Sequence, residues 1–140
     1  MPGSLRYRAI AVRVVAEACR LVSRPDQESD TANPGYDLTH PFDAAVVSAF
    51  AEIYNNIAIH AYDRRDGGEP IELALWIERD AITIELRDQG RPFEIDEVPV
   101  PSLDELHEGG MGIHIARSLL DQVDYEPGPP NLWRLRKRTR

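Results

Sequence analysis

A chain of 140 residues with 42% apolar and 29% charged residues suits one compact globular domain and leaves no room for a second. Its formal net charge of −8 argues against general nucleic-acid binding, which requires clustered Lys and Arg to neutralise phosphates. The sequence contains no run of about 18 apolar residues that could span a membrane. The chain also opens without a signal-peptide pattern, so we expect a cytoplasmic protein. The single cysteine, Cys19, cannot form an internal disulfide and is interpreted as a small apolar filler.

The first predicted element is an amphipathic helix over residues 5–22. Its apolar residues recur at helical spacing, and arginines occupy the other side. The apolar set is Ile10, Val14, Ala18 and Leu21 or Val22, and the arginines are Arg6, Arg13 and Arg20. Residues 23–41 then change to Pro, Asp, Ser, Asn and Gly without periodicity, which predicts a long loop or linker.

The second predicted helix, over residues 42–62, is apolar on nearly every side and contains no Pro or Gly, so we expect it to be buried. Only one polar stripe runs along it, at intervals of four residues: Ser48, Glu52, Asn56 and His60. Buried polar groups need hydrogen-bond partners, water, an ion or a ligand. The stripe therefore indicates the wall of a wet cavity, and the alternative at this point is the solvent face of an amphipathic core helix.

Two short segments with alternating apolar residues follow, over 71–77 and 81–87, and predict an antiparallel hairpin with one face on the core. Directly after the second of them comes Asp88-Gln89-Gly90, an acidic residue at a strand end followed by a turn. Loops at strand ends are where binding residues gather. Asp88 could equally be a simple turn residue.

Residues 94–108 combine prolines and acidic residues with little periodicity and are interpreted as a flap. The flap ends in a run of glycines, Gly109-Gly110-Met111-Gly112, which opens a third predicted helix. Glycines at a helix start let backbone N–H groups approach an anion, although glycine clusters also make plain hinges. The final segment, 131–138, alternates as expected of a last strand.

Three motifs stand in a fixed order: Glu-x-x-x-Asn-x-x-x-His on a helix, Asp-x-Gly after a strand, and Gly-Gly-x-Gly opening a helix. In this arrangement residues 42–137 resemble the GHKL, or histidine kinase-like, ATPase superfamily and its small branch of anti-sigma-factor serine/threonine kinases. The resemblance implies a single domain over 1–140 with a two-layer α/β sandwich, the Bergerat ATP-binding fold. Its sheet would be mixed and largely antiparallel with helices on one face, and 94–108 would be the ATP lid.

Carried over by position, the resemblance implies that Asn56 ligates a Mg²⁺ that bridges the ATP phosphates and that Glu52 orients or deprotonates the attacking nucleophile. Asp88 would accept a hydrogen bond from the adenine amino group, and Gly90 would let the base approach the backbone. The phosphates would lie against the start of the third helix, at Gly110, Met111 and Gly112.

Three positions depart from the family pattern. Pro92 stands where the second glycine of the Asp-x-Gly-x-Gly motif is usual, and Glu108 stands where the kinase branch often has an arginine that reaches the terminal phosphate. The last strand commonly offers a threonine that assists adenine recognition, whereas this one reads Asn131-Leu132-Trp133. Nucleotide binding is therefore better supported by this sequence than phosphoryl transfer is.

The function that the resemblance implies is an ATP-dependent serine kinase that phosphorylates an anti-anti-sigma (STAS-type) partner and sequesters a sigma factor or another regulator. The alternative is a catalytically weak or inactive nucleotide-gated binding module, and a third interpretation is a domain that retains the fold alone. ATP or ADP and Mg²⁺ are the expected ligands, and nucleic acid and membrane are not expected partners. The sequence does not determine whether the chain forms a homodimer.

Overall fold

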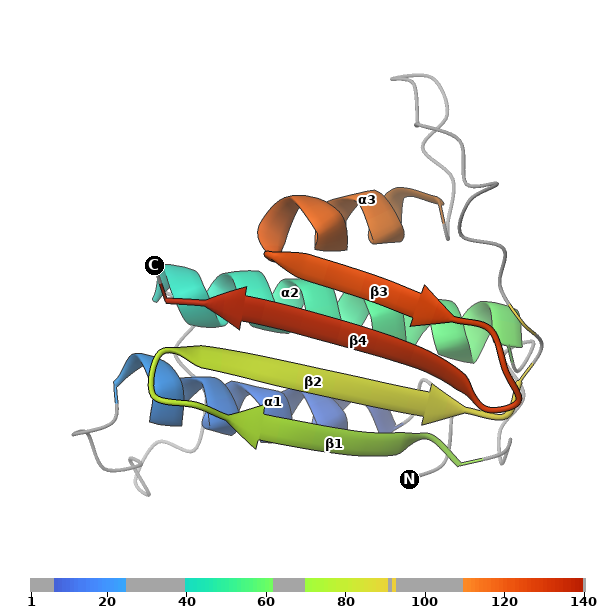
Figure 1. Cartoon of the computed structure of the whole chain (residues 1–140), viewed down its shortest axis with the longest axis horizontal. Coiled ribbons are helices and arrows are strands. Elements are labelled where there is room, and N and C mark those ends of the chain that lie inside the picture. Colours follow the sequence, from blue (N-terminus) through green and yellow to red (C-terminus); the bar gives the residue numbers. More distant parts are fainter. Residues whose placement is uncertain (1–6, 25–39, 62–69, 91, 93–109, 140) are drawn as a thin grey trace.

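The computed structural model describes residues 7–24, 40–61, 70–90, 92 and 110–139 of the chain. A four-stranded sheet with the strand order β1-β2-β4-β3 forms one layer, and three helices form the other (Figure 1). All three strand pairings are antiparallel. The predicted two-layer α/β sandwich with helices on one face is therefore confirmed. The predicted linker 23–41 falls largely, and the predicted lid 94–108 entirely, outside the described residues.

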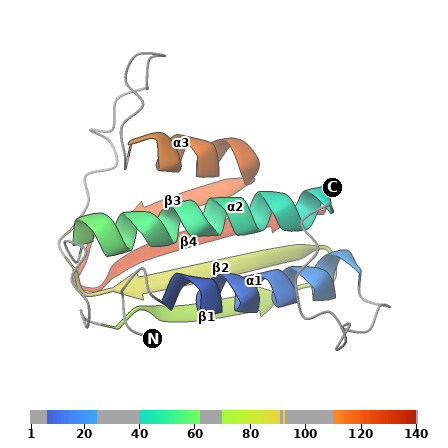
Figure 2. The same ribbon diagram turned by 180° about the vertical axis from the view of Figure 1, so that it is seen from behind.

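Helix α2 (Pro41–Asn56) is the centre of the helical layer and lies between α1 (Arg8–Ser23) and α3 (Gly110–Leu119) (Figure 2). A π-helical turn over Ile57–Ala61 continues it, so the helix predicted over 42–62 is confirmed in place. Pro41 begins the helix, where its missing N–H costs nothing. Phe50, Ile53 and Tyr54 are fully buried. The helix is buried because apolar side chains surround nearly its whole circumference.

The buried face of α1 agrees only in part with the one that the spacing predicted: Ala18 and Val22 are buried, but the other predicted residues are not. Ile10, Val14 and Leu21 are 56%, 45% and 43% exposed, and the buried set is Ala11, Val12, Val15, Ala16, Ala18, Cys19 and Val22. Most of the buried side chains are small, which lets α1 pack closely on its neighbours. Because apolar residues lie on both sides of the helix, the spacing alone did not determine which side would be buried. Cys19 is fully buried as expected, and burial raises the pKa of its thiol to about 12.

The sheet consists of β1 (Glu72–Ile77), β2 (Ala81–Asp88), β3 (Gln122–Glu126) and β4 (Asn131–Arg138). The hairpin and the last strand are confirmed, whereas β3 was not predicted. Its inward side chains, Val123 and Tyr125, lie opposite Leu135 and Trp133 of β4. The Tyr125 and Trp133 rings have centroids 4.4 Å apart, so β3 closes the core at this edge of the sheet.

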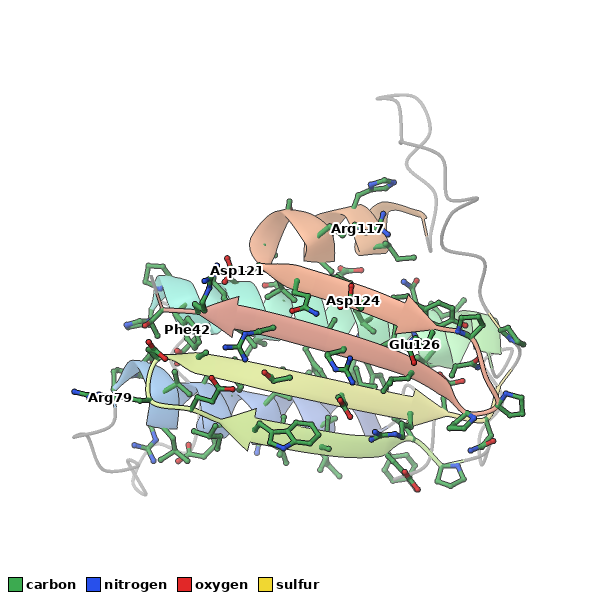
Figure 3. The ribbon with its side chains drawn as sticks, in the orientation of Figure 1. Phe42, Arg79, Arg117, Asp121, Asp124 and Glu126 are labelled. Carbon is green, nitrogen blue, oxygen red and sulfur yellow. The ribbon has the colours of Figure 1, made fainter. Side chains whose placement is uncertain are left out.

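No described helix covers the outer face of the sheet (Figure 3), which carries charged side chains together with Trp76, 47% exposed. Glu85 at its centre forms ion pairs with Arg87 and Arg134, each with an N···O distance of 2.8 Å. Arg136 pairs with Glu78 in the same way at 3.0 Å. The charges on this face compensate one another, which suits a surface in contact with water.

Asp43 joins the end of α1 to the start of α2 through a buried ion pair. Its carboxylate is 2% exposed and accepts hydrogen bonds from the Ser23 hydroxyl at 2.7 Å and from Arg24 Nη2 at 2.8 Å. His40 Nδ1 lies 3.7 Å from the same carboxylate. Because these residues flank the segment 25–39, the cluster fixes the two helices on either side of it.

Asp43→Asn should lower the free energy of unfolding by about 3 kcal/mol, because the substitution leaves the half-buried Arg24 guanidinium without a compensating charge. The matched control is Glu17→Gln, which also removes a carboxylate paired with a half-buried arginine, here Arg20 at i, i+3, but the Glu17 carboxylate is exposed whereas that of Asp43 is buried. The control should cost at most about 0.5 kcal/mol. Urea denaturation measures both values, and equal losses would contradict the assigned role of Asp43.

Candidate functional site

Five helix and strand ends lie at one end of the molecule. Figures 1 and 2 show the carboxyl end of α2 and the ends of β2 and β3 on the same side as the first residues of β4 and of α3. The three motifs found in the sequence lie on α2, on β2 and at the start of α3. The fold therefore places together residues that are as far apart in sequence as positions 52 and 112.

The two adjacent asparagines near the end of α2 face different surroundings. Asn55 accepts a hydrogen bond from Arg8 Nη1 at 2.8 Å and so faces α1. Asn56 is 5% exposed, and its Nδ2 makes no hydrogen bond within the described part of the chain. A buried amide without a partner is costly, so Asn56 is the one of the pair that is suited to contact a ligand. This is the asparagine that the sequence pattern indicated.

Glu52 lies directly against the first turn of α3. A Cβ atom built on Gly112 would come within 2.7 Å of Glu52 Oε2 and 3.4 Å of Glu52 Cβ. Only glycine fits at this position without displacing the carboxylate. The absence of a side chain thus lets the half-buried Glu52 lie beside the amino-terminal turn of α3, where backbone N–H groups favour negative charge.

Asp88 is the last residue of β2 and is 1% exposed. Its Oδ1 accepts a hydrogen bond from the backbone N–H of Gly90 and another from Asn131 Nδ2, both at 2.9 Å. Burial raises the pKa of the Asp88 carboxyl, and the two hydrogen bonds lower it by less. The donors are neutral, so the carboxylate is oriented without being neutralised.

The remaining predicted site residues are placed less completely. Gly110 is the first and Met111 the second residue of α3, Gly90 is half-buried, and Pro92 is exposed. Along the polar stripe of α2, exposure falls from the exposed Ser48 through the half-buried Glu52 to the buried Asn56. A plain solvent face does not account for Asn56. The side chains of His60 and Met111, and all of Glu108, lie outside the described residues.

Asn131 was noted in the sequence only as part of the stretch Asn131-Leu132-Trp133, which lacks the family's threonine, yet it contacts Asp88 directly. It is the first residue of β4, and the β2–β4 register places it opposite Asp88. The alternation of the last segment gives no register, so the sequence alone could not pair the two side chains. An amide at the start of a strand that follows a glycine- and proline-rich turn was the available signal.

A protein-family model described as a histidine kinase-like ATPase domain matches residues 2–137 of the chain. The chain belongs to this family. None of the helices in the described ranges is long and apolar enough to cross a membrane.

Curated relatives of the histidine kinase-like ATPase domain include serine-protein kinases named RsbW. Identity is 29% over 83 residues with the protein from Bacillus velezensis, 30% over 83 residues with that from Oceanobacillus iheyensis, and 28% over 83 residues with that from Bacillus subtilis. Each alignment covers 54% of this chain and 51% or 52% of the relative. The chain thus spans about half the length of the curated relatives it matches.

Among solved structures, the fold is similar to the histidine kinase domain of the Erythrobacter litoralis EL346 blue-light activated histidine kinase, with a TM-score of 0.52 and 15% identity. The superposition covers 69% of this chain and 44% of the other. At this identity the similarity supports the fold alone.

The Glu52–Gly112 contact can be tested by stability. Alanine is favoured over glycine inside a helix by about 1 kcal/mol, but Gly112→Ala should gain less than this because the new Cβ makes the Glu52 carboxylate shift. In a Glu52→Ala background the same change should stabilise the domain by about 0.5–1 kcal/mol. Urea denaturation of all four proteins gives the coupling, and the same effect in both backgrounds would rule the contact out.

The raised pKa of Asp88 predicts a pH-dependent stability. A folded-state pKa above the ordinary 3.8 means that stability is present below that value and is lost as pH rises through the raised pKa. Asp88→Asn keeps an oxygen for Gly90 and Asn131 and removes the buried charge. The variant should therefore be more stable than the wild type at pH 7, with the difference shrinking toward pH 4.

The control for this comparison is Asp80→Asn, at the exposed turn between β1 and β2, where the charge that is removed already lies in water. Unfolding free energies measured from pH 4 to pH 8 should show a growing difference for position 88 and a flat one for position 80. A flat difference at both would contradict the desolvation of Asp88.

Proposed function

We propose that this chain is a single ATP- and Mg²⁺-binding domain that phosphorylates a serine on an anti-anti-sigma (STAS-type) partner and sequesters a sigma factor or another regulator. The observation that carries the proposal is that Glu52 contacts Gly112 at the start of α3, while Asn56 ends α2 and Asp88 ends β2 on the same side of the fold (Figures 1 and 2). The similarity to serine-protein kinases supports the choice of phosphoryl acceptor. The site of action would be the cytoplasm.

The nucleotide would lie between Asp88 and α3. Asp88 is an acceptor-only group and suits the adenine amino group, and Gly90 beside it leaves room for the base. Residues 94–108 connect the two motifs in sequence and would form the lid. Backbone N–H groups of Gly110, Met111 and Gly112 would hold the phosphates, as helix amino termini do for anions.

The Asn56 side chain offers one amide oxygen for a magnesium site, because Mg²⁺ takes oxygen ligands and needs few from the protein when phosphates supply others. Its unpartnered Nδ2 is a donor and would be suited to a phosphate oxygen. A bound Mg²⁺ would neutralise charge on the phosphates. Glu52, half-buried and one turn earlier, would accept the proton of the serine hydroxyl or orient it for attack. Phosphoryl transfer in this domain would then depend on positioning more than on covalent chemistry.

One feature of the sequence supports an alternative function, a nucleotide-gated binding module without catalysis. Glu108 would place a carboxylate where the kinase branch often has an arginine, and it would repel the transferred phosphate instead of stabilising it. Binding of ATP and transfer of its phosphate must therefore be measured separately.

Calorimetric titration of the purified protein with ATP, with and without Mg²⁺, should show micromolar binding that depends on the metal. Asn56→Ala should weaken Mg-ATP binding by about 10-fold or more, because the buried amide is lost from the metal site. Ser48→Ala, two turns earlier on the same stripe and exposed, is the control and should bind normally. No binding by the wild type at millimolar nucleotide would reject the proposal.

Glu52→Ala distinguishes the kinase from the binding module. It should reduce phosphate transfer to a serine-containing partner by about 100-fold or more while leaving the Kd for Mg-ATP within about threefold. A wild type that binds Mg-ATP but transfers nothing to candidate partners would favour the module. Equal transfer by both proteins would remove Glu52 from the chemistry.

A further inference from the structure

Asn131 uses every hydrogen-bonding group of its side chain within the protein. Its Nδ2 donates to Asp88 Oδ1 at 2.9 Å and to the Gly90 carbonyl oxygen at 2.8 Å. Its Oδ1 accepts the backbone N–H of Gly128 at 2.7 Å. With the residue only 1% exposed, this side chain ties the end of β2, the turn after it and the β3–β4 turn together.

These three bonds also fix which way the amide points. Rotating it by 180° would set its oxygen against two acceptors and its NH₂ against the donor of Gly128. A Cβ atom on Gly128 would overlap the backbone of Pro130, so glycine is needed for this turn to approach Asn131. The donor side of Asn131 is therefore held toward Asp88.

Two donors, Gly90 N–H and Asn131 Nδ2, converge on Oδ1 of Asp88. Neither hydrogen bond involves Oδ2. The two donors therefore fix the rotation of the carboxylate about the Cβ–Cγ bond, and Oδ2 points in a defined direction. Both donors are neutral, so that oxygen keeps its charge and accepts hydrogen bonds only.

We propose that Asn131 is a positioning residue that orients Asp88 and thereby sets a preference for purine nucleotides with a 6-amino group over those with a 6-oxo group. An amino group donates to the presented oxygen, whereas a 6-oxo group sets one acceptor against another. The inference rests on the proposed nucleotide function and adds a residue and a substrate preference to it.

The test compares the Kd values of Mg-ATP and Mg-ITP, whose bases carry a 6-amino and a 6-oxo group, for the wild type and four variants. The wild type should prefer ATP by about 10-fold or more. Asn131→Ala should weaken ATP binding and bring the ratio close to one, because the carboxylate can then rotate and take up water. Asn55→Ala, whose side chain pairs with Arg8 on the other side of α2, is the control and should keep the wild-type ratio.

Asp88→Asn supplies the sharper result. The donors of Gly90 and Asn131 should hold the amide oxygen of the new side chain, so its NH₂ replaces Oδ2 and donates to a 6-oxo group. The preference should then invert in favour of ITP. The double variant Asp88→Asn/Asn131→Ala should lose this inversion, because one of the two orienting donors is gone.

The outcomes separate the two levels of the proposal. A wild type that binds neither nucleotide rejects the proposed function itself. A wild type that prefers ATP, together with an Asn131→Ala protein that keeps the same ratio and loses only thermal stability, overturns the positioning role. If Asn131→Ala does not fold, Asp88→Asn decides alone, and an unchanged preference for ATP in that variant overturns the inference.

Discussion

The burial of α2 is the constraint on which the rest of this structure depends. A helix covered by the sheet, by α1 and by α3 can keep polar residues only where each has a partner or a ligand. Asp43 at its start has Ser23 and Arg24, and Asn55 near its end has Arg8. The amide of Asn56 stands apart because its Nδ2 has no partner among the described residues.

Two buried aspartates at opposite ends of the fold illustrate two uses of a carboxylate. Asp43 is paired with an arginine, and this ion pair links the end of α1 to the start of α2. Asp88 is held by a backbone N–H and an amide, which orient it without compensating its charge. Keeping that charge buried lowers stability near neutral pH. Such a cost is typical of a residue that is retained for binding.

The junction between α2 and α3 shows how a glycine can serve a neighbouring side chain. Gly112 leaves the space that the Glu52 carboxylate occupies, so the acidic group of one helix lies against the amino-terminal turn of the next. The turn between β3 and β4 plays a similar part for Asn131 through Gly128. In both places the absence of a side chain on one segment positions a functional group on another.

The sequence by itself determined every described element except β3, and the motifs that these elements carry. The interval of four residues put Glu52 and Asn56 on one side of a helix, and the alternation of 131–138 placed the last strand with its observed bounds. These features follow from local periodicity and steric preference, which any segment carries with it.

Only the tertiary structure decided which face of α1 is buried, that β3 pairs with β4, and that Asn131 holds Asp88. Helix α1 has apolar residues on two sides. The side with the smaller side chains faces the core because it allows the closest packing, and Ile10 and Val14 on the other side are exposed. Strand register and contacts between distant residues depend on the whole core being packed at once. Local patterns hold no record of that, and so the residue opposite Asp88 could not be found before the fold was known.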